Sequence, residues 1–76
     1  MPKIGQLIRM KDNHFNIKAG RIGLIIEQYR NYAGRIKTNE FGIYFPDNEQ
    51  YSAWIYDYEF EIIDDPIKSY RGDNNG

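Results

Sequence analysis

Apolar residues in this chain occur as short runs, and residues that favour turns separate one run from the next. Within the runs, apolar and polar side chains alternate, which is the period of a β-strand. No stretch shows the period of a long amphipathic helix. The pattern therefore predicts an all-β fold. We expect strands over residues 5–11, 21–28, 41–45, 51–56 and 60–63.

The length of the chain limits how it can be stabilised. Its 76 residues are enough for one domain, and a domain of this size buries only about 60% of its unfolded surface. Because there is no cysteine, an apolar core must replace the disulfides of many small domains. An open sheet would expose its edge strands, whereas a closed barrel has none. We therefore predict a small five-stranded barrel over residues 1–66 and a flexible tail over residues 67–76.

The predicted core consists of apolar residues that share a face within three of the strands. Their burial is the main source of stability that the sequence offers. They are Ile22, Leu24, Ile26, Ile43, Phe45, Phe60 and Ile62. Trp54, the only tryptophan, fits either the core or an exposed position that anchors a partner. Because Ile55 is available for the opposite face of the same strand, core burial is the favoured position for Trp54.

Charge is distributed unevenly between the two halves of the chain. Residues 1–37 hold eight Lys/Arg and two acids, a balance of +6. Residues 38–76 hold two Lys/Arg and nine acids, a balance of −7, so that the sum is the net charge of −1. Such a distribution either gives the folded surface two poles or lets the two halves pair with each other.

Several segments together resemble a known family. They are Gly5–Lys11 (GQLIRMK), Gly20–Glu27 (GRIGLIIE), Ile43–Asp47 (IYFPD), and Trp54 with Tyr58–Ile63 (YEFEII). Over about residues 5–63 the pattern is similar to small SH3-like barrel proteins of tailed bacteriophages. The resemblance implies an SH3-like barrel encoded by a phage. Related SH3-like modules of the KOW type bind RNA or proteins of the transcription and translation machinery, but a fold alone does not define a function.

The same resemblance suggests how the charges are placed, because the last strand of an SH3-like barrel lies near the first. Glu59 and Glu61 would then point outward and oppose Arg9 and Lys11 across the strands. Each such pair contributes about 0.2–1 kcal/mol to stability. On this interpretation the two halves pair and close the barrel.

The residues that enzymes and metal sites need are scarce. His14 is the only histidine, and its loop holds no serine or cysteine, so we predict a solvated histidine and no enzyme. The spacing of Asp57, Glu59 and Glu61 matches no loop for a hard cation, so we expect no metal, cofactor or small-molecule substrate. The longest apolar stretch, residues 22–26, is far shorter than the roughly 20 residues of a membrane span. Without a signal peptide or cysteine, the chain is expected in the cytoplasm, that of the host cell if a phage encodes it.

A segment that mixes aromatic and basic residues is the main candidate for a binding site. Residues 29–37 (YRNYAGRIK) contain two tyrosines, three cations and no acid. This composition suits single-stranded RNA or DNA, because bases stack on rings while cations neutralise phosphates. It also suits a protein interface, or a solvated loop without a partner. We predict a long, partly ordered loop over Tyr29–Glu40, with an extended hairpin over residues 29–37 as the alternative. With Trp54 added, the candidate binding residues are Tyr29, Arg30, Tyr32, Arg35, Lys37 and Trp54.

The overall charge favours a protein partner over nucleic acid. With a net charge of −1 and a pI of about 5.7, the chain lacks the basic surplus of dedicated nucleic-acid domains. We therefore expect a non-enzymatic interaction module that binds a host or phage protein. Binding of single-stranded RNA or DNA through residues 29–37 is the alternative.

Overall fold

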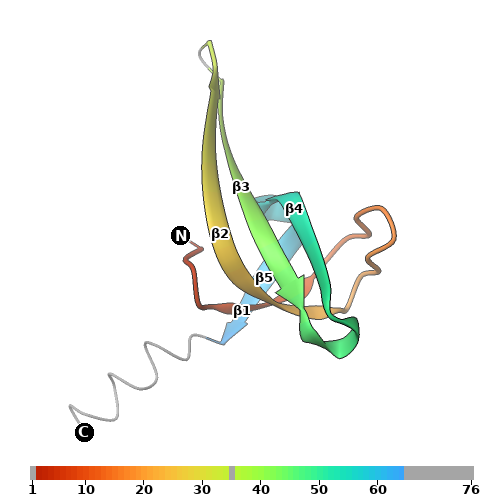
Figure 1. The fold of residues 1–76 in the computed structure, drawn as a ribbon. Coiled ribbons are helices and arrows are strands. Elements are labelled where there is room, and N and C mark those ends of the chain that lie inside the picture. Colours follow the sequence, from red (N-terminus) through yellow and green to blue (C-terminus); the bar gives the residue numbers. More distant parts are fainter. Residues whose placement is uncertain (1, 35, 65–76) are drawn as a thin grey trace, which may run out of the picture.

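Five antiparallel strands form a single sheet in the computed structural model, which describes residues 2–34 and 36–64 (Figure 1). The strands are β1 (Leu7–Met10), β2 (Ile22–Ala33), β3 (Ile36–Phe45), β4 (Gln50–Tyr56) and β5 (Phe60–Asp64). Short 3₁₀ turns, η1 (Pro46–Asn48) and η2 (Asp57–Glu59), join β3 to β4 and β4 to β5. The strand order is β4-β3-β2-β1-β5, which confirms the all-β prediction. Within the described residues β4 and β5 do not pair, so hydrogen bonds do not close this sheet into a barrel.

The ends of the strands follow the sequence pattern in most places. The strands predicted over residues 41–45, 51–56 and 60–63 are present within β3, β4 and β5. Pro46 ends β3 because its ring leaves no N–H for the ladder. The predicted tail, residues 67–76, lies outside the described part of the chain. Within that part, no helix has the length and apolar character needed to cross a membrane.

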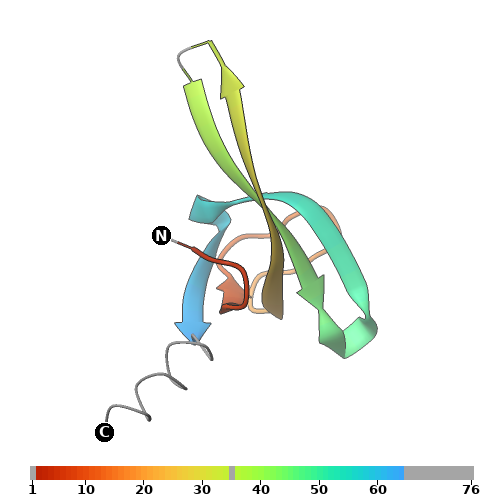
Figure 2. The same cartoon turned by 60° about the vertical axis from the view of Figure 1, so that its left-hand side comes forward.

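The prediction of a loop over residues 29–40 was wrong. β2 and β3 continue through this segment as a long hairpin, and their pairing runs from Leu24↔Tyr44 to Ala33↔Ile36. Gly34 has a φ of +63°, a region that glycine adopts without steric cost, so the chain can reverse there. Figures 1 and 2 show that this hairpin projects well beyond the other strands. Part of the sheet therefore stands clear of the core.

The core consists of nine buried apolar side chains. They are Ile8, Met10, Ile17, Ile25, Phe41, Ile43, Phe45, Ile55 and Phe60. Burial of Ile43, Phe45 and Phe60 confirms the predicted core in β3 and β5. Ile62 lies opposite the buried Ile8 in the β1–β5 pair, on the side of the sheet that faces the core. It nevertheless remains exposed, because β5 is an edge strand.

The face predicted for β2 was also wrong. Ile25 is buried, whereas Ile22 and Ile26 are 38% and 39% exposed and Leu24 is half-buried. Gly23 shows why the strand takes this orientation. A Cβ at Gly23 would lie 2.5 Å from Cγ2 of Ile43, so a core side chain packs directly on the Gly23 backbone. Only the glycine-bearing face of β2 leaves room for this packing.

A bulge in β4 places Trp54 outside the core, contrary to the prediction. Phe41 pairs with Ile55 and Ile43 pairs with Ser52, so two residues of β4 lie opposite the single residue Gly42 of β3. Trp54 is one of these two residues and has a φ of +66°. Because of the extra residue, the side chain of Ile55 points into the core, whereas that of Trp54 lies outside it and is 56% exposed.

Ion pairs join the positively and negatively charged halves of the chain. Arg9 pairs with Glu61 across β1 and β5 at 3.3 Å, as predicted, and Arg21 pairs with Asp47 at 2.7 Å. The backbone N–H of Lys11 donates to the carbonyl of Glu59 at 2.8 Å, but the side chain of Glu59, in η2, is turned inward and does not face that of Lys11 as predicted. Its carboxylate accepts a bond from the backbone N–H of Tyr56 at 2.9 Å and lies 3.0 Å from Nδ1 of His14. The side chain of His14 is therefore only 10% exposed instead of solvated.

Candidate functional site

Strand alternation divides the predicted binding segment between two faces of the hairpin. Residues directly opposite each other in an antiparallel pair share a face, and successive residues alternate. Tyr29 pairs with Glu40, whereas Arg30 pairs with Asn39. Lys37 pairs with Tyr32 and shares the face of Arg30. The predicted segment is therefore divided: Arg30, Tyr32 and Lys37 share one face of the hairpin in register, and Tyr29 lies on the other.

Two of the predicted binding residues do meet. Tyr29 in β2 and Trp54 in β4 have ring centroids 5.1 Å apart, with 31° between the ring planes. Aromatic pairs at such distances gain interaction energy in addition to that from the surface area they bury. Arg30 and Lys37 lie on the face opposite Tyr29, and Arg35 lies outside the described residues. The bulge that exposes Trp54 thus creates a site from two distant segments of the chain.

The carboxylate of Glu27 fixes two tyrosines on the same face. The hydroxyl of Tyr29 donates to Oε2 of Glu27 at 2.5 Å, and the hydroxyl of Tyr51 donates to Oε1 at 2.6 Å. These two hydrogen bonds lower the pKa of Glu27, and the bond from Tyr29 has the larger effect. The bond to Glu27 also raises the pKa of Tyr51, because ionisation would place a second negative charge beside the carboxylate. Glu27 therefore stays charged and Tyr51 stays neutral near neutral pH.

Gly42 allows Tyr51 to lie close to the sheet. Gly42 pairs with Glu27 in register. A Cβ at Gly42 would lie 2.6 Å from the hydroxyl oxygen of Tyr51 and 3.1 Å from Cβ of Glu27. The tyrosine ring therefore crosses the glycine backbone to reach the carboxylate. The sequence holds a signal for part of this arrangement, because Glu27 and Tyr29 are two residues apart and share a face in any strand.

Glu40 is a buried carboxylate at the centre of this face. Its register neighbours are Tyr29 on β2 and Tyr56 on β4, and only 5% of Glu40 is exposed. The negative charge of Glu40 is the main cause that raises the pKa of Tyr56. Oε2 of Glu40 is buried and has no hydrogen-bond partner among the described residues. Sequence reasoning missed Glu40, because its burial depends on the aromatic residues that flank it from other strands.

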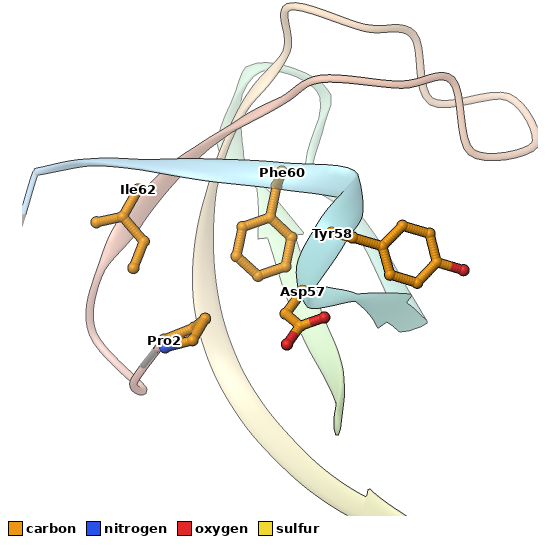
Figure 3. Close-up of a pocket in the computed structure, with 5 residues that line it drawn as sticks. All are labelled: Pro2, Asp57, Tyr58, Phe60 and Ile62. Carbon is orange, nitrogen blue, oxygen red and sulfur yellow. The ribbon is translucent and has the colours of Figure 1, made fainter. Parts of the chain in front are cut away.

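These residues form what we name the aromatic–carboxylate face: Glu27, Tyr29, Glu40, Tyr51, Trp54 and Tyr56. Tyr58 of η2 extends it, because its ring stacks on that of Tyr56 with centroids 5.3 Å apart and 7° between the planes. Tyr58 also lines a pocket of about 450 Å³ beside the core residue Phe60. Figure 3 shows Phe60 at the centre of this pocket, with Pro2 and Ile62 on one side and Asp57 and Tyr58 on the other.

The acidic residues of this face, which belong to the described part of the chain, are not grouped as a metal site. Within residues 2–34 and 36–64, no three His, Cys, Asp or Glu side chains are grouped so that they could hold a metal ion. The chemistry that the face offers is that of rings and carboxylates, which suits non-covalent binding. No family model, curated protein sequence or solved structure matches this chain. The geometry of the face is therefore the basis for assigning a function.

Proposed function

We propose that this protein is a non-enzymatic interaction module that binds another protein through the aromatic–carboxylate face. The observation that carries the proposal is the exposed ring of Trp54, which contacts the ring of Tyr29 at a tilt. The hydroxyl of Tyr29 is in turn held by Glu27. Tryptophan and tyrosine dominate the residues on which protein interfaces depend most. Rings that are already fixed lose little conformational entropy when a partner docks.

The finer assignment to an SH3-like barrel encoded by a phage belongs to the same proposal. β5 pairs with β1, and the short turn η2 leads into β5. Both features support the assignment, since the last strand of an SH3-like barrel lies near the first. The partner would then be a host or phage protein.

Single-stranded nucleic acid is the less favoured partner. Its recognition needs rings and cations on one surface, so that bases stack while phosphates are neutralised. Here Arg30 and Lys37 share their face with Tyr32, and that face lies opposite the one on which Tyr29 meets Trp54. Glu27 and Glu40 place negative charge beside the rings, where it would repel phosphates.

A capture experiment with matched variants tests the proposal. The tagged protein, Trp54→Ala and Phe15→Ala would each be incubated with lysates of infected and uninfected bacteria, with and without nuclease. Phe15 is the control because it is a highly exposed aromatic residue outside the face. We expect the wild type and Phe15→Ala to capture the same protein regardless of nuclease, and Trp54→Ala to lose it. Capture that nuclease abolishes would favour nucleic acid, and equal capture by Trp54→Ala would place the site elsewhere.

A further inference from the structure

The aromatic–carboxylate face carries negative charge with no opposite charge within it. Its six residues include Glu27 and Glu40 and no Lys or Arg. The nearest basic residues of the hairpin, Arg30 and Lys37, lie at register positions on its opposite face. Such a surface is complementary to a positively charged group on the partner.

The two carboxylates differ in what they can still accept. Both oxygens of Glu27 are engaged by tyrosine hydroxyls. Oε2 of Glu40 is buried without a hydrogen-bond partner among the described residues. A buried charged oxygen without a donor is costly. A ligand that brings a donor to Glu40 would remove this cost.

The rings around Glu40 select the kind of donor. Tyr29 and Tyr56 flank Glu40 in register, and the ring of Trp54 lies against that of Tyr29. Cations are attracted to the faces of such rings, and the planar guanidinium of arginine stacks on them while it donates to a carboxylate. The protein contains one example of this arrangement elsewhere. The guanidinium carbon of Arg21 lies 4.7 Å from the centre of the Phe45 ring, while Nη2 donates to Asp47 at 2.7 Å.

We propose that the aromatic–carboxylate face binds an arginine side chain of its partner, stacked on Trp54 and hydrogen-bonded to Oε2 of Glu40. The inference rests on the proposed protein-binding function and names the chemistry of the partner. Because Oε2 is covered, docking requires the neighbouring ring of Tyr56, which is not among the tyrosines bonded to Glu27, to move aside. The partner is therefore a protein segment that presents an exposed arginine.

The probe for this test is a labelled Gly-Ser peptide that contains arginine, compared with the same peptide containing citrulline. Citrulline keeps the shape of arginine but has no charge. Binding is followed by the anisotropy of the label and by the emission of Trp54, the only tryptophan. We expect the arginine peptide to bind saturably and to change this emission, and the citrulline peptide to bind at least about tenfold more weakly.

Two substitutions assign the binding to the face. Glu40→Gln, which keeps the shape of the side chain, should weaken binding of the arginine peptide about tenfold or more. Glu61→Gln, at an exposed carboxylate paired with Arg9 on another part of the sheet, should leave it unchanged. Trp54→Ala provides a second variant at an exposed position and should weaken binding as well. Thermal unfolding of each variant verifies that it is folded.

Three results would overturn the inference. They are equal binding of the citrulline peptide, unchanged binding by folded Glu40→Gln together with Trp54→Ala, and no binding of the arginine peptide. If the capture of a protein partner remains sensitive to Trp54→Ala in any of these cases, the proposed function stands and only the arginine assignment fails. Self-association that depends on Trp54 would instead identify a second copy as the occupant.

Discussion

The two faces of the sheet use aromatic residues in opposite ways. On the inner face, Phe41 and Phe45 are fully buried, and Phe41 meets Phe60 edge to face with ring centroids 5.5 Å apart. On the outer face, Tyr29 and Tyr51 keep their rings partly in solvent and their hydroxyls on the carboxylate of Glu27. The rings have nearly the same size. The hydroxyl decides the difference, because a buried hydroxyl needs a partner whereas a phenyl ring does not.

Each face also contains a glycine that a larger side chain covers. On the inner face, Ile43 and Phe45 pack on Gly23. On the outer face, Tyr51 crosses Gly42. The inner contact is enclosed on all sides, whereas the ring of Tyr51 can swing toward solvent. A covered glycine thus supports close packing of the core on one side and the approach of an exposed tyrosine to its carboxylate on the other.

The largest difference in stability is expected between alanine variants of two adjacent isoleucines of β2, one buried and one exposed. Ile25→Ala should lower the free energy of unfolding by about 2–5 kcal/mol, because it removes fully buried methylene groups from the core. Ile26→Ala should lower it by less than about 1 kcal/mol, because the side chain is exposed. Urea unfolding of both variants measures the difference. Equal losses would show that the two faces of β2 are not distinct.

Alanine substitutions at Gly23 and Gly42 should change the unfolding free energy by intermediate amounts. Gly23→Ala should cost about 1–3 kcal/mol of unfolding free energy, because the new methyl group overpacks the core at Ile43. Gly42→Ala should cost less than Gly23→Ala, because Tyr51 can move outward. It should nevertheless weaken capture of the partner, since Tyr51 would leave Glu27. A larger stability loss for Gly42→Ala would contradict the view that the outer face is adaptable.

The smallest effect concerns the response of the outer face to acid. The pKa of Glu27 is lowered in the folded protein from an ordinary value of 4.5, so the carboxylate stabilises the fold above about pH 4.5 and loses this contribution as the pH falls. The melting temperature of the wild type should therefore fall more steeply below this pH than that of Glu27→Gln. Glu49→Gln, at an exposed acid beside η1, controls for the loss of one negative charge. Parallel curves for the wild type and Glu27→Gln would mean that the tyrosine bonds do not act on this carboxylate.

Tyr51 should show the opposite dependence. Its pKa is raised in the folded state from 10.0, so its contribution is present below pH 10 and declines as the pH rises further. Tyr51→Phe removes the group that titrates, and its stability should therefore depend less on alkaline pH than that of the wild type. The acid and alkaline responses together distinguish the outer face from the inner face, whose core residues have no ionisable side chain.

Several features of the fold were predictable because they depend on neighbouring residues alone. Alternation of apolar residues, with Pro46 after Phe45, marked the strand that ends there. The opposition of Arg9 and Glu61 followed from the resemblance, through the expectation that the first and last strands lie side by side. The candidate site was predictable only in part. Tyr29 and Trp54 were both named, but nothing near either residue in the chain indicates that they touch.

Local sequence was enough to specify strands with turns between them, because strand period and turn chemistry act over a few residues. Which side of each strand faces the core depends instead on packing between strands. β2 has isoleucines on both sides, and the packing of Ile43 on Gly23 selects between them. The bulge opposite Gly42 turns Trp54 outward, and η2 turns Glu59 inward to His14. These side-chain orientations could not be predicted from the local sequence, because each depends on a residue in a strand or loop that is distant in the chain.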